Sequence, residues 1–154
     1  MRLTEQTRYA VRVVAYCAAH HPERVRAHEI ADALGLTEFT VFKLLKTARD
    51  ANLLDTTRGR QGGIRLGFDP ALMSVGQIVR AFEPRFQQCG PAALFGTDDG
   101  GLEPYDFSTS EAFGRGVNAF LGELDTIRIT DLLAREEMRG GTPPATESHA
   151  GDDR

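Results

Sequence analysis

Polar and cationic side chains recur through residues 37–65 in a pattern that suits nucleic-acid binding. Hydroxyl, carboxylate and ammonium groups on one amphipathic segment could bond base edges, and guanidinium groups in the Gly-rich loop after it could contact phosphates. The candidate DNA-binding residues are Thr37, Glu38, Thr40, Lys43, Arg58, Arg60, Gln61 and Arg65. The competing interpretation of the loop is a solvated turn, and Phe39 could either touch a thymine methyl or pack in the core.

These side chains differ in what they could bind on a duplex. Thr40 could bond a base edge or a phosphate, and Lys43 could reach guanine acceptors or a phosphate. Glu38 could accept a hydrogen bond from cytosine N4. Arg58 or Arg60 could enter a narrow minor groove, where A·T-rich sequence deepens the negative potential.

Apolar periodicity indicates which elements must hold these residues. Spacings of three and four predict helices over 4–20, 27–34 and 38–50, which must bury their apolar stripes against one another. The period then changes, so that 53–57 and 64–66 are strand-like around a Gly-rich turn. The sequence therefore predicts a winged helix-turn-helix whose recognition helix enters the major groove.

Turn and cap residues mark the predicted helix boundaries. Gly35 supplies the backbone freedom for a sharp turn, and Thr37 can cap the helix that follows. Ser74 opens a capping-box helix that ends before Pro84. The positions expected to be buried are Ala10, Val13, Val14, Cys17, Ala27, Ile30, Ala31, Leu34, Val41, Leu44, Leu45, Ala48, Val75, Ile78, Val79 and Phe82.

The C-terminal half contains one long amphipathic helix. Residues 85–109 include six Gly or Pro and are predicted to form a long loop. A helix is expected from about Ser110 to Thr126, and a short final helix begins near Thr130. The core of so small a protein leaves little room to bury this second amphipathic face, so the long helix is assigned to a homodimer interface. The alternative is that it folds back onto its own chain.

Composition and charge distribution exclude several classes of protein. Residues 1–68 carry eleven Lys or Arg against seven Asp or Glu, whereas 69–154 carry seven against fifteen. The excess of basic residues in 1–68 coincides with the expected DNA-binding region, although the net charge of the whole chain is −4. Arg8 and Arg12 interrupt any apolar signal segment and no run could span a membrane, so we expect a cytoplasmic protein without a membrane partner.

Four segments together resemble one known family of winged-helix regulators. They are Met1-Arg2-Leu3-Thr4, Thr7-Arg8-Tyr9-Ala10-Val11-Arg12, Glu29-Ile30-Ala31 and Arg58-Gly59-Arg60-Gln61-Gly62-Gly63-Ile64-Arg65-Leu66. The family is the Rrf2 type, which includes IscR, NsrR and RirA, and the opening segment is most similar to the iron-responsive rhizobial members. The likeness covers residues 1–84 and continues more loosely to Leu133. It implies a homodimeric transcription factor, usually a repressor, whose long helix crosses to the partner.

The resemblance also implies an iron–sulfur cluster, of the 2Fe-2S type, held by three cysteines of the loop. Only Cys89 matches such a position, because 96–110 contains no cysteine. Cys89 could be one metal ligand of a cluster completed by other groups, a redox-sensitive thiol, or a residue without a role. The other candidate ligands are Glu5, His28, Asp98, Asp99, Glu103, Asp106 and Glu111. Cys17, on the first apolar stripe, is assigned to the core.

The predicted fold class is mainly α with a small β-hairpin: a winged helix-turn-helix plus a long C-terminal dimerisation helix. The expected organisation is a DNA-binding domain (1–84), a sensor loop (85–109), the dimerisation helix with a short terminal helix (110–136), and a disordered tail (137–154). A homodimer would bind a double-stranded DNA operator with approximate dyad symmetry.

The leading functional hypothesis is an iron-responsive repressor of iron or iron–sulfur metabolism genes, in which gain or loss of a cluster changes operator affinity. The alternatives are a thiol-redox-sensing or cluster-free regulator and, in another class, a winged helix that binds proteins. An enzyme is not expected, because the sequence contains no phosphate-binding Gly loop, no HExxH or CxxC motif and no nucleophile elbow.

Overall fold

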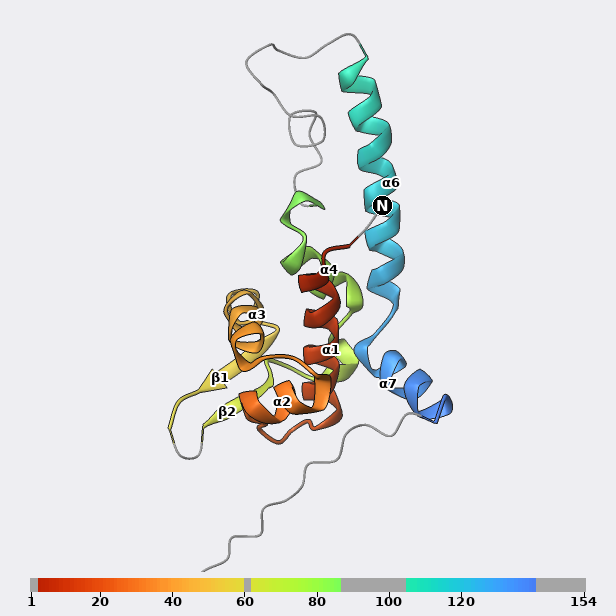
Figure 1. Cartoon of the computed structure of the whole chain (residues 1–154). Coiled ribbons are helices and arrows are strands. Elements are labelled where there is room, and N and C mark those ends of the chain that lie inside the picture. The colour runs from red at the N-terminus through yellow and green to blue at the C-terminus, as the bar shows by residue number, and fades with distance from the viewer. Residues whose placement is uncertain (1–2, 60–61, 87–104, 141–154) are drawn as a thin grey trace, which may run out of the picture.

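A computed structural model describes residues 3–59, 62–86 and 105–140, without the side chains of residues 106 and 107. Helices precede and follow a single two-stranded sheet in this part of the chain (Figure 1), which confirms the predicted fold class. The elements are α1 (Glu5–Ala19), α2 (Ala27–Leu34), α3 (Glu38–Asp50), β1 (Leu54–Thr57), β2 (Gly63–Leu66), η1 (Pro70–Leu72), α4 (Val75–Phe82), η2 (Pro84–Phe86), α6 (Asp106–Thr126) and α7 (Ile129–Met138). No described helix has the length and apolar character needed to cross a membrane.

The first three helices pack their apolar stripes into one core, as the periodicity predicts. The buried stripe residues are Ala10, Val13, Val14 and Cys17 of α1, Ile30 and Ala31 of α2, and Val41, Leu44, Leu45 and Ala48 of α3. Ala27 and Leu34 lie at the edge of this core and are only partly buried. Burial of these faces holds the two short helices of the helix-turn-helix against α1.

The turn between α2 and α3 has the predicted chemistry. Gly35 adopts a left-handed conformation with φ of 63°, which a residue without Cβ adopts at low cost. The hydroxyl of Thr37 accepts a hydrogen bond from the backbone N–H of Thr40 at 3.2 Å and thereby caps α3. Helix α3 therefore begins at Glu38, as predicted.

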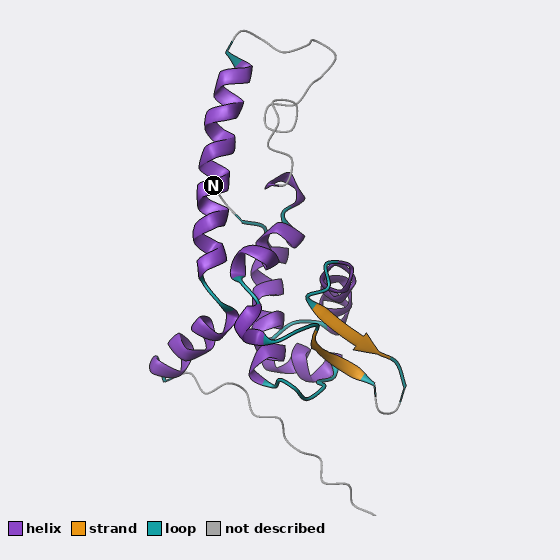
Figure 2. Ribbon diagram, turned by 180° about the vertical axis from the view of Figure 1, so that it is seen from behind, coloured by secondary structure: helices purple, strands orange, loops and turns teal. Residues whose placement is uncertain are grey.

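Strands β1 and β2 with the turn between them form the wing. The strands are antiparallel, with Asp55 opposite Arg65 and Thr56 opposite Ile64. Val25, in the segment between α1 and α2, exchanges two backbone hydrogen bonds of 2.8 Å with Ile64. This third segment fixes the wing to the helical core (Figure 2).

Helix α4 begins with the predicted capping box. Ser74 accepts from the N–H of Gln77 at 3.2 Å, and the Gln77 side chain accepts from the N–H of Ser74 at 2.8 Å. The helix ends before Pro84, as predicted. Of the expected buried positions Ile78, Val79 and Phe82 are buried, and Val75 is half-buried.

Helix α6 differs from its prediction in both length and packing. It begins at Asp106, four residues before the predicted Ser110. Its inner half lies along α4, where Leu121 forms a small core with Val79 and Phe86. The expectation that the small core could not accommodate this helix is therefore wrong for the inner half, which folds back onto its own chain.

The outer half of α6 extends beyond the other described elements (Figure 1). Phe113 is 58% exposed there, although its spacing places it on the apolar stripe of the helix. Ala112, Phe113, Gly116 and Val117 line a shallow groove of about 360 Å³. The assignment of this half to a homodimer interface stays a prediction.

Helix α7 continues to Met138, two residues beyond the predicted limit of 136. Its first residue, Ile129, is fully buried in the main core, and its N–H donates to the carbonyl of Met73 at 2.8 Å. Most of the predicted sensor loop, residues 87–104, and the tail from 141 onward lie outside the described residues.

Candidate nucleic-acid interface

The outward face of α3 carries the predicted polar residues. Val41, Leu44 and Leu45 of this helix face the core, whereas Glu38, in its first turn, and Lys43 are exposed. Thr37, just before the helix, is also exposed, and Thr40 is half-buried. The two threonine hydroxyls lie 2.9 Å apart and belong to the helix cap, so they are held in place before any ligand arrives.

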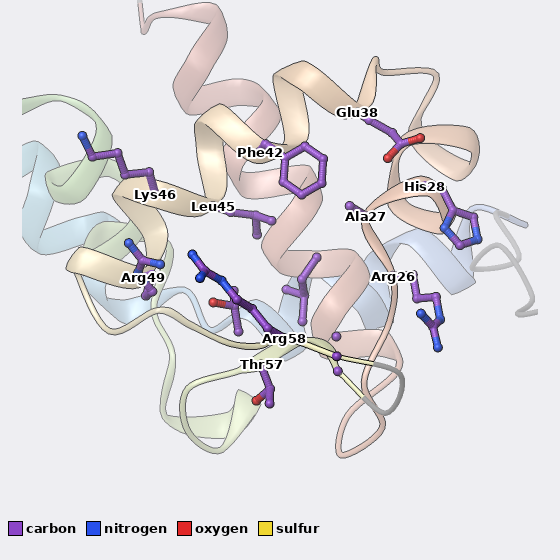
Figure 3. A pocket seen from close by; sticks show the side chains of 15 residues that line it. Arg26, Ala27, His28, Glu38, Phe42, Leu45, Lys46, Arg49, Thr57 and Arg58 are labelled. Carbon is purple, nitrogen blue, oxygen red and sulfur yellow. The ribbon is translucent and has the colours of Figure 1, made fainter.

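A groove of about 510 Å³ separates α3 from the wing (Figure 3). Its lining comes from the start of α2, one side of α3 and both arms of the wing. The lining residues are Arg26, Ala27, His28, Glu38, Phe42, Leu45, Lys46, Arg49, Thr56, Thr57, Arg58, Gly59, Gly62, Gly63 and Ile64. The structure thus brings Glu38 and Arg58, which are distant in sequence, to one concave surface.

The groove is strongly cationic. Arg26, Lys46, Arg49 and Arg58 line it, and Glu38 is the only carboxylate among its described lining residues. In Figure 3, Lys46, Arg49 and Arg58 lie on one side of the groove and Arg26 on the other. Side chains of one sign around a concave surface concentrate the opposite charge, so this surface attracts an anion.

Arg65 lies apart from this groove. The cross-strand pair Thr56 and Ile64 lines the groove, whereas the next pair, Asp55 and Arg65, does not. Nε of Arg65 lies 3.2 Å from Oδ2 of Asp55, and the same oxygen accepts from Arg24 at 3.0 Å. The hydrogen bond from Arg24, more than that from Arg65, lowers the pKa of the Asp55 carboxyl.

Several residues of the interface were not among the sequence candidates. Phe42 and Arg49 line the groove, and so do Arg26 and His28 at the start of α2. Phe39, for which core packing was one expectation, is 79% exposed. The signal for the α3 residues was their spacing: positions 39, 42, 46 and 49 follow one helical stripe opposite the core stripe.

Three predicted site residues lie outside the part of the chain that the structure describes. They are Arg60 and Gln61, between Gly59 and Gly62 in the sequence, and Cys89.

Cys17 has the character expected of a core residue. Its side chain is fully buried on α1, and burial raises the pKa of the thiol to about 12. A thiol in this state is neutral at physiological pH, and the thiolate is the form that binds metals. Cys17 is therefore unsuited to ligate a metal or to react with an oxidant.

Glu83 is a buried carboxylate at the end of α4 and is 1% exposed. Its Oε1 accepts from the backbone N–H of Thr4 at 2.6 Å and from the hydroxyl of Thr7 at 2.7 Å, and Arg85 lies 3.0 Å from its Oε2. Burial alone would raise the pKa of this carboxyl, but these hydrogen bonds and the Arg85 charge outweigh burial and lower the pKa. The ionised carboxylate ties the start of α1 to the end of α4.

The family described as Rrf2, "Iron-dependent Transcriptional regulator", matches residues 3–135, which is most of the chain. The chain belongs to the Rrf2 family. This family consists of transcriptional regulators that bind DNA, which confirms the expectation that the protein is not an enzyme.

Rrf2 relatives match along nearly the whole length of the chain. "Protein aau3" of Rhizobium meliloti (strain 1021) is 36% identical over 138 residues, covering 86% of this chain and 85% of that protein. "HTH-type transcriptional regulator NsrR" of Bacillus licheniformis is 26% identical over 140 residues, covering 89% of this chain and 95% of that protein.

Solved structures support the same fold. CymR, the "Global Cysteine Regulator of B. subtilis", superposes with a TM-score of 0.66 at 24% identity and covers 88% of this chain and 98% of its own. "T. potens IscR" superposes with a TM-score of 0.65 at 24% identity and covers 90% of each chain. At this identity these two structures establish the winged-helix architecture of the Rrf2 protein and no finer property.

Proposed function

We propose that this Rrf2 protein acts as a homodimer that binds a double-stranded operator through α3 and the wing. The observation that carries the proposal is the groove between these elements, with its four cations and single carboxylate among the described lining residues. A duplex would bring phosphates to Lys46, Arg49 and Arg58 while the first turns of α3 meet base edges in the major groove.

The roles of the individual residues follow from their positions. Thr37, Glu38, Thr40 and Lys43 would contact bases or the nearest phosphates, since they surround the N-terminal half of α3. At the wing, Arg58, Arg60 and Gln61 would contact the flanking backbone or the minor groove. We assign a smaller role to Arg65, because it would have to leave Asp55 to bind a phosphate.

The test of DNA binding is its dependence on salt. The logarithm of the binding constant falls with the logarithm of salt concentration by about 0.9 for each phosphate contact. We expect the double variant Lys46→Ala/Arg49→Ala to weaken binding and to reduce this slope by about 2, measured by fluorescence anisotropy on an operator selected from random duplexes. Arg135→Ala, an exposed cation on α7, is the control and should leave the slope unchanged. An unchanged slope in the double variant would refute the role of the groove.

The proposed dimer uses the outer half of α6. A second copy that packs there would bury Phe113 and the shallow groove beside it, and would set two copies of α3 against two half-sites of approximate dyad symmetry. Phe113→Arg should shift the molar mass in light scattering from dimer to monomer, whereas Met138→Arg, at an exposed position of α7, should not. A monomeric parent protein would contradict the proposal.

Iron-responsive repression, with an iron–sulfur cluster as the sensor, is the regulatory part of the proposal. The family description and the position of Cys89 support it. The donor set does not fit a cluster held by the thiolates of one chain, because the sequence has two cysteines and Cys17 is buried and protonated. Nor do the described residues contain a group of three His, Cys, Asp or Glu side chains that could hold a metal ion.

Chemical analysis decides this regulatory part. Under the cluster hypothesis, protein purified without oxygen should contain iron and acid-labile sulfide, and Cys89→Ala should lose both. The cysteine count favours a second candidate, a thiol-redox or cluster-free regulator, which would contain neither. In that case Cys89→Ala should abolish the effect of peroxide on operator affinity if the thiol is the sensor, and the effect should be absent from the parent if no sensor of this kind exists.

A further inference from the structure

We propose that Phe39 and Phe42 recognise thymine by contacting its C5-methyl group, and that they set the sequence preference of α3. The inference rests on the proposed DNA binding. Both side chains project from the outer face of the helix: Phe39 is 79% exposed and Phe42 is 57% exposed. They lie three residues apart, so they are neighbours on one helical stripe.

The core does not require these two phenyl groups. The opposite face of α3 already supplies Val41, Leu44, Leu45 and Ala48, all of them buried. Large apolar side chains are usually withdrawn from water, and a cluster of them at the surface typically marks a binding site. Phe42 also lines the groove beside the wing (Figure 3).

The surrounding charges identify the occupant as a nucleic acid. Lys43, on the exposed face, and Lys46, Arg49 and Arg58, in the groove lining, lie around the phenyl groups. Arg49 has only a loose, exposed contact of 3.8 Å with Asp50. An apolar protein surface would cover these cations without neutralising them, which is costly. A duplex presents phosphates to the cations and base edges to the phenyl groups at the same time.

The chemistry of the phenyl group selects the base. A phenylalanine has no hydrogen-bond donor or acceptor, so it cannot recognise the polar groups in the major groove. The thymine C5-methyl is the apolar group that this groove presents. Residues three apart are separated by about 4.5 Å along a helix axis, against about 3.4 Å between base pairs. Phe39 and Phe42 can therefore contact two neighbouring base pairs.

Replacing thymine by uracil tests the inference, because uracil lacks only the methyl group. An operator is first selected from random-sequence duplexes with the parent protein, and each thymine is then replaced singly. We expect two positions in each half-site at which uracil weakens binding about fourfold, which corresponds to one buried methyl. Uracil at every other position should have no effect.

The two variants assign each position to a side chain. Phe39→Ala should lose the preference for thymine over uracil at one position and keep it at the other, and Phe42→Ala should do the reverse. Leu72→Ala removes another exposed apolar side chain, from η1, and should keep both preferences. Circular dichroism should show unchanged folding, because both phenyl groups are exposed.

The outcomes separate this inference from the proposed function. Equal affinity for thymine and uracil operators, or thymine preferences that survive in both Phe variants, would overturn the inference and leave DNA binding intact. Failure of the parent to enrich any duplex would overturn both.

Discussion

Substitution of Gly76 by alanine tests how α6 is held against α4. Gly76 is buried in the first turn of α4, and an added Cβ would collide with the carboxylate of Asp125 and lie 3.0 Å from Nη1 of Arg80. That carboxylate forms hydrogen bonds of 2.5 and 2.6 Å with the guanidinium of Arg80 and accepts one of 3.3 Å from Ser74. The methyl group therefore displaces the end of the Asp125 side chain and breaks these contacts.

Two opposing effects determine how much Gly76→Ala changes the free energy of unfolding. Replacing a helical glycine by alanine stabilises by about 0.5–1 kcal/mol, because the unfolded chain loses freedom. The ion pair is bidentate but its side chains are 37% and 40% exposed. Its contribution lies between about 1 kcal/mol for an exposed pair and about 3 kcal/mol for a hydrogen bond to a charged group in the interior. We expect Gly76→Ala to lower the free energy of unfolding by about 1 kcal/mol, the difference between these effects.

Urea unfolding at one fixed protein concentration, followed by circular dichroism, measures this change. In an Asp125→Ala background no carboxylate opposes the methyl group, so Gly76→Ala should change sign and stabilise by about 0.5 kcal/mol. The control is Gly122→Ala in α6, where an added Cβ meets nothing within 4 Å and should stabilise in both backgrounds. Equal destabilisation by Gly76→Ala in both backgrounds would refute the displacement of Asp125 as the cause.

Three further predictions concern a buried carboxylate, a thiol and a helix cap. Folding lowers the pKa of Glu83, so its contribution is complete above the unfolded pKa of about 4.3 and is lost as the pH falls through the folded value. Glu83→Gln should therefore weaken the pH dependence of the free energy of unfolding between about pH 5 and 3 in urea titrations, and an unchanged dependence would contradict this. In a Cys89→Ala protein, Cys17 should react with a disulfide reagent such as DTNB only after unfolding; rapid reaction of the folded protein would disprove its burial. Thr37→Ala should destabilise by about 1 kcal/mol in urea unfolding and Thr37→Ser by much less, whereas equal effects would exclude the hydroxyl as a cap.

The helix-turn-helix was predictable because its signals are local. Gly35 and Thr37 mark the turn and the cap, and the apolar stripes of α2 and α3 have regular helical spacing. Short-range geometry and core burial favour the same boundaries here, so the predicted ends of both helices agree with the structure. The wing was predicted in the same way, because the hydrophobic periodicity changes from helical to strand-like after α3.

The start of α6 had no comparable signal. The residue before the helix is Tyr105, with φ of 77° and no side-chain cap. Ser108 and Ser110, whose residue type is typical of helix N-caps, lie inside this helix rather than at its start. The inner half of α6 is held against α4 by the contact between Arg80 and Asp125, which are 45 residues apart in the sequence. Hydrophobic periodicity within one segment cannot reveal a partner at that distance.

The candidate interface was predicted in part for a related reason. The arginines of the wing were selected by residue type alone, but only the structure shows that Arg58 lines the groove whereas Arg65 pairs with Asp55 outside it. A search for polar chemistry also passed over Phe42, although its spacing placed it on the outer stripe of α3. Arg26 was missed because it joins the groove only through the packing of α2 beside the wing.

The outer face of α3 destabilises the free protein, and the way in which it does so indicates what this face binds. Phe39 and Phe42 leave apolar surface in water, while Lys46, Arg49 and Arg58 gather like charges around one groove. Polar residues at positions 39 and 42, and fewer cations at positions 46, 49 and 58, would stabilise the free protein and increase its solubility. A protein partner with an apolar surface would relieve only the first cost, and a small anion only the second. A DNA duplex relieves both at once, because its phosphates neutralise the cations and its thymine methyls cover the phenyl groups.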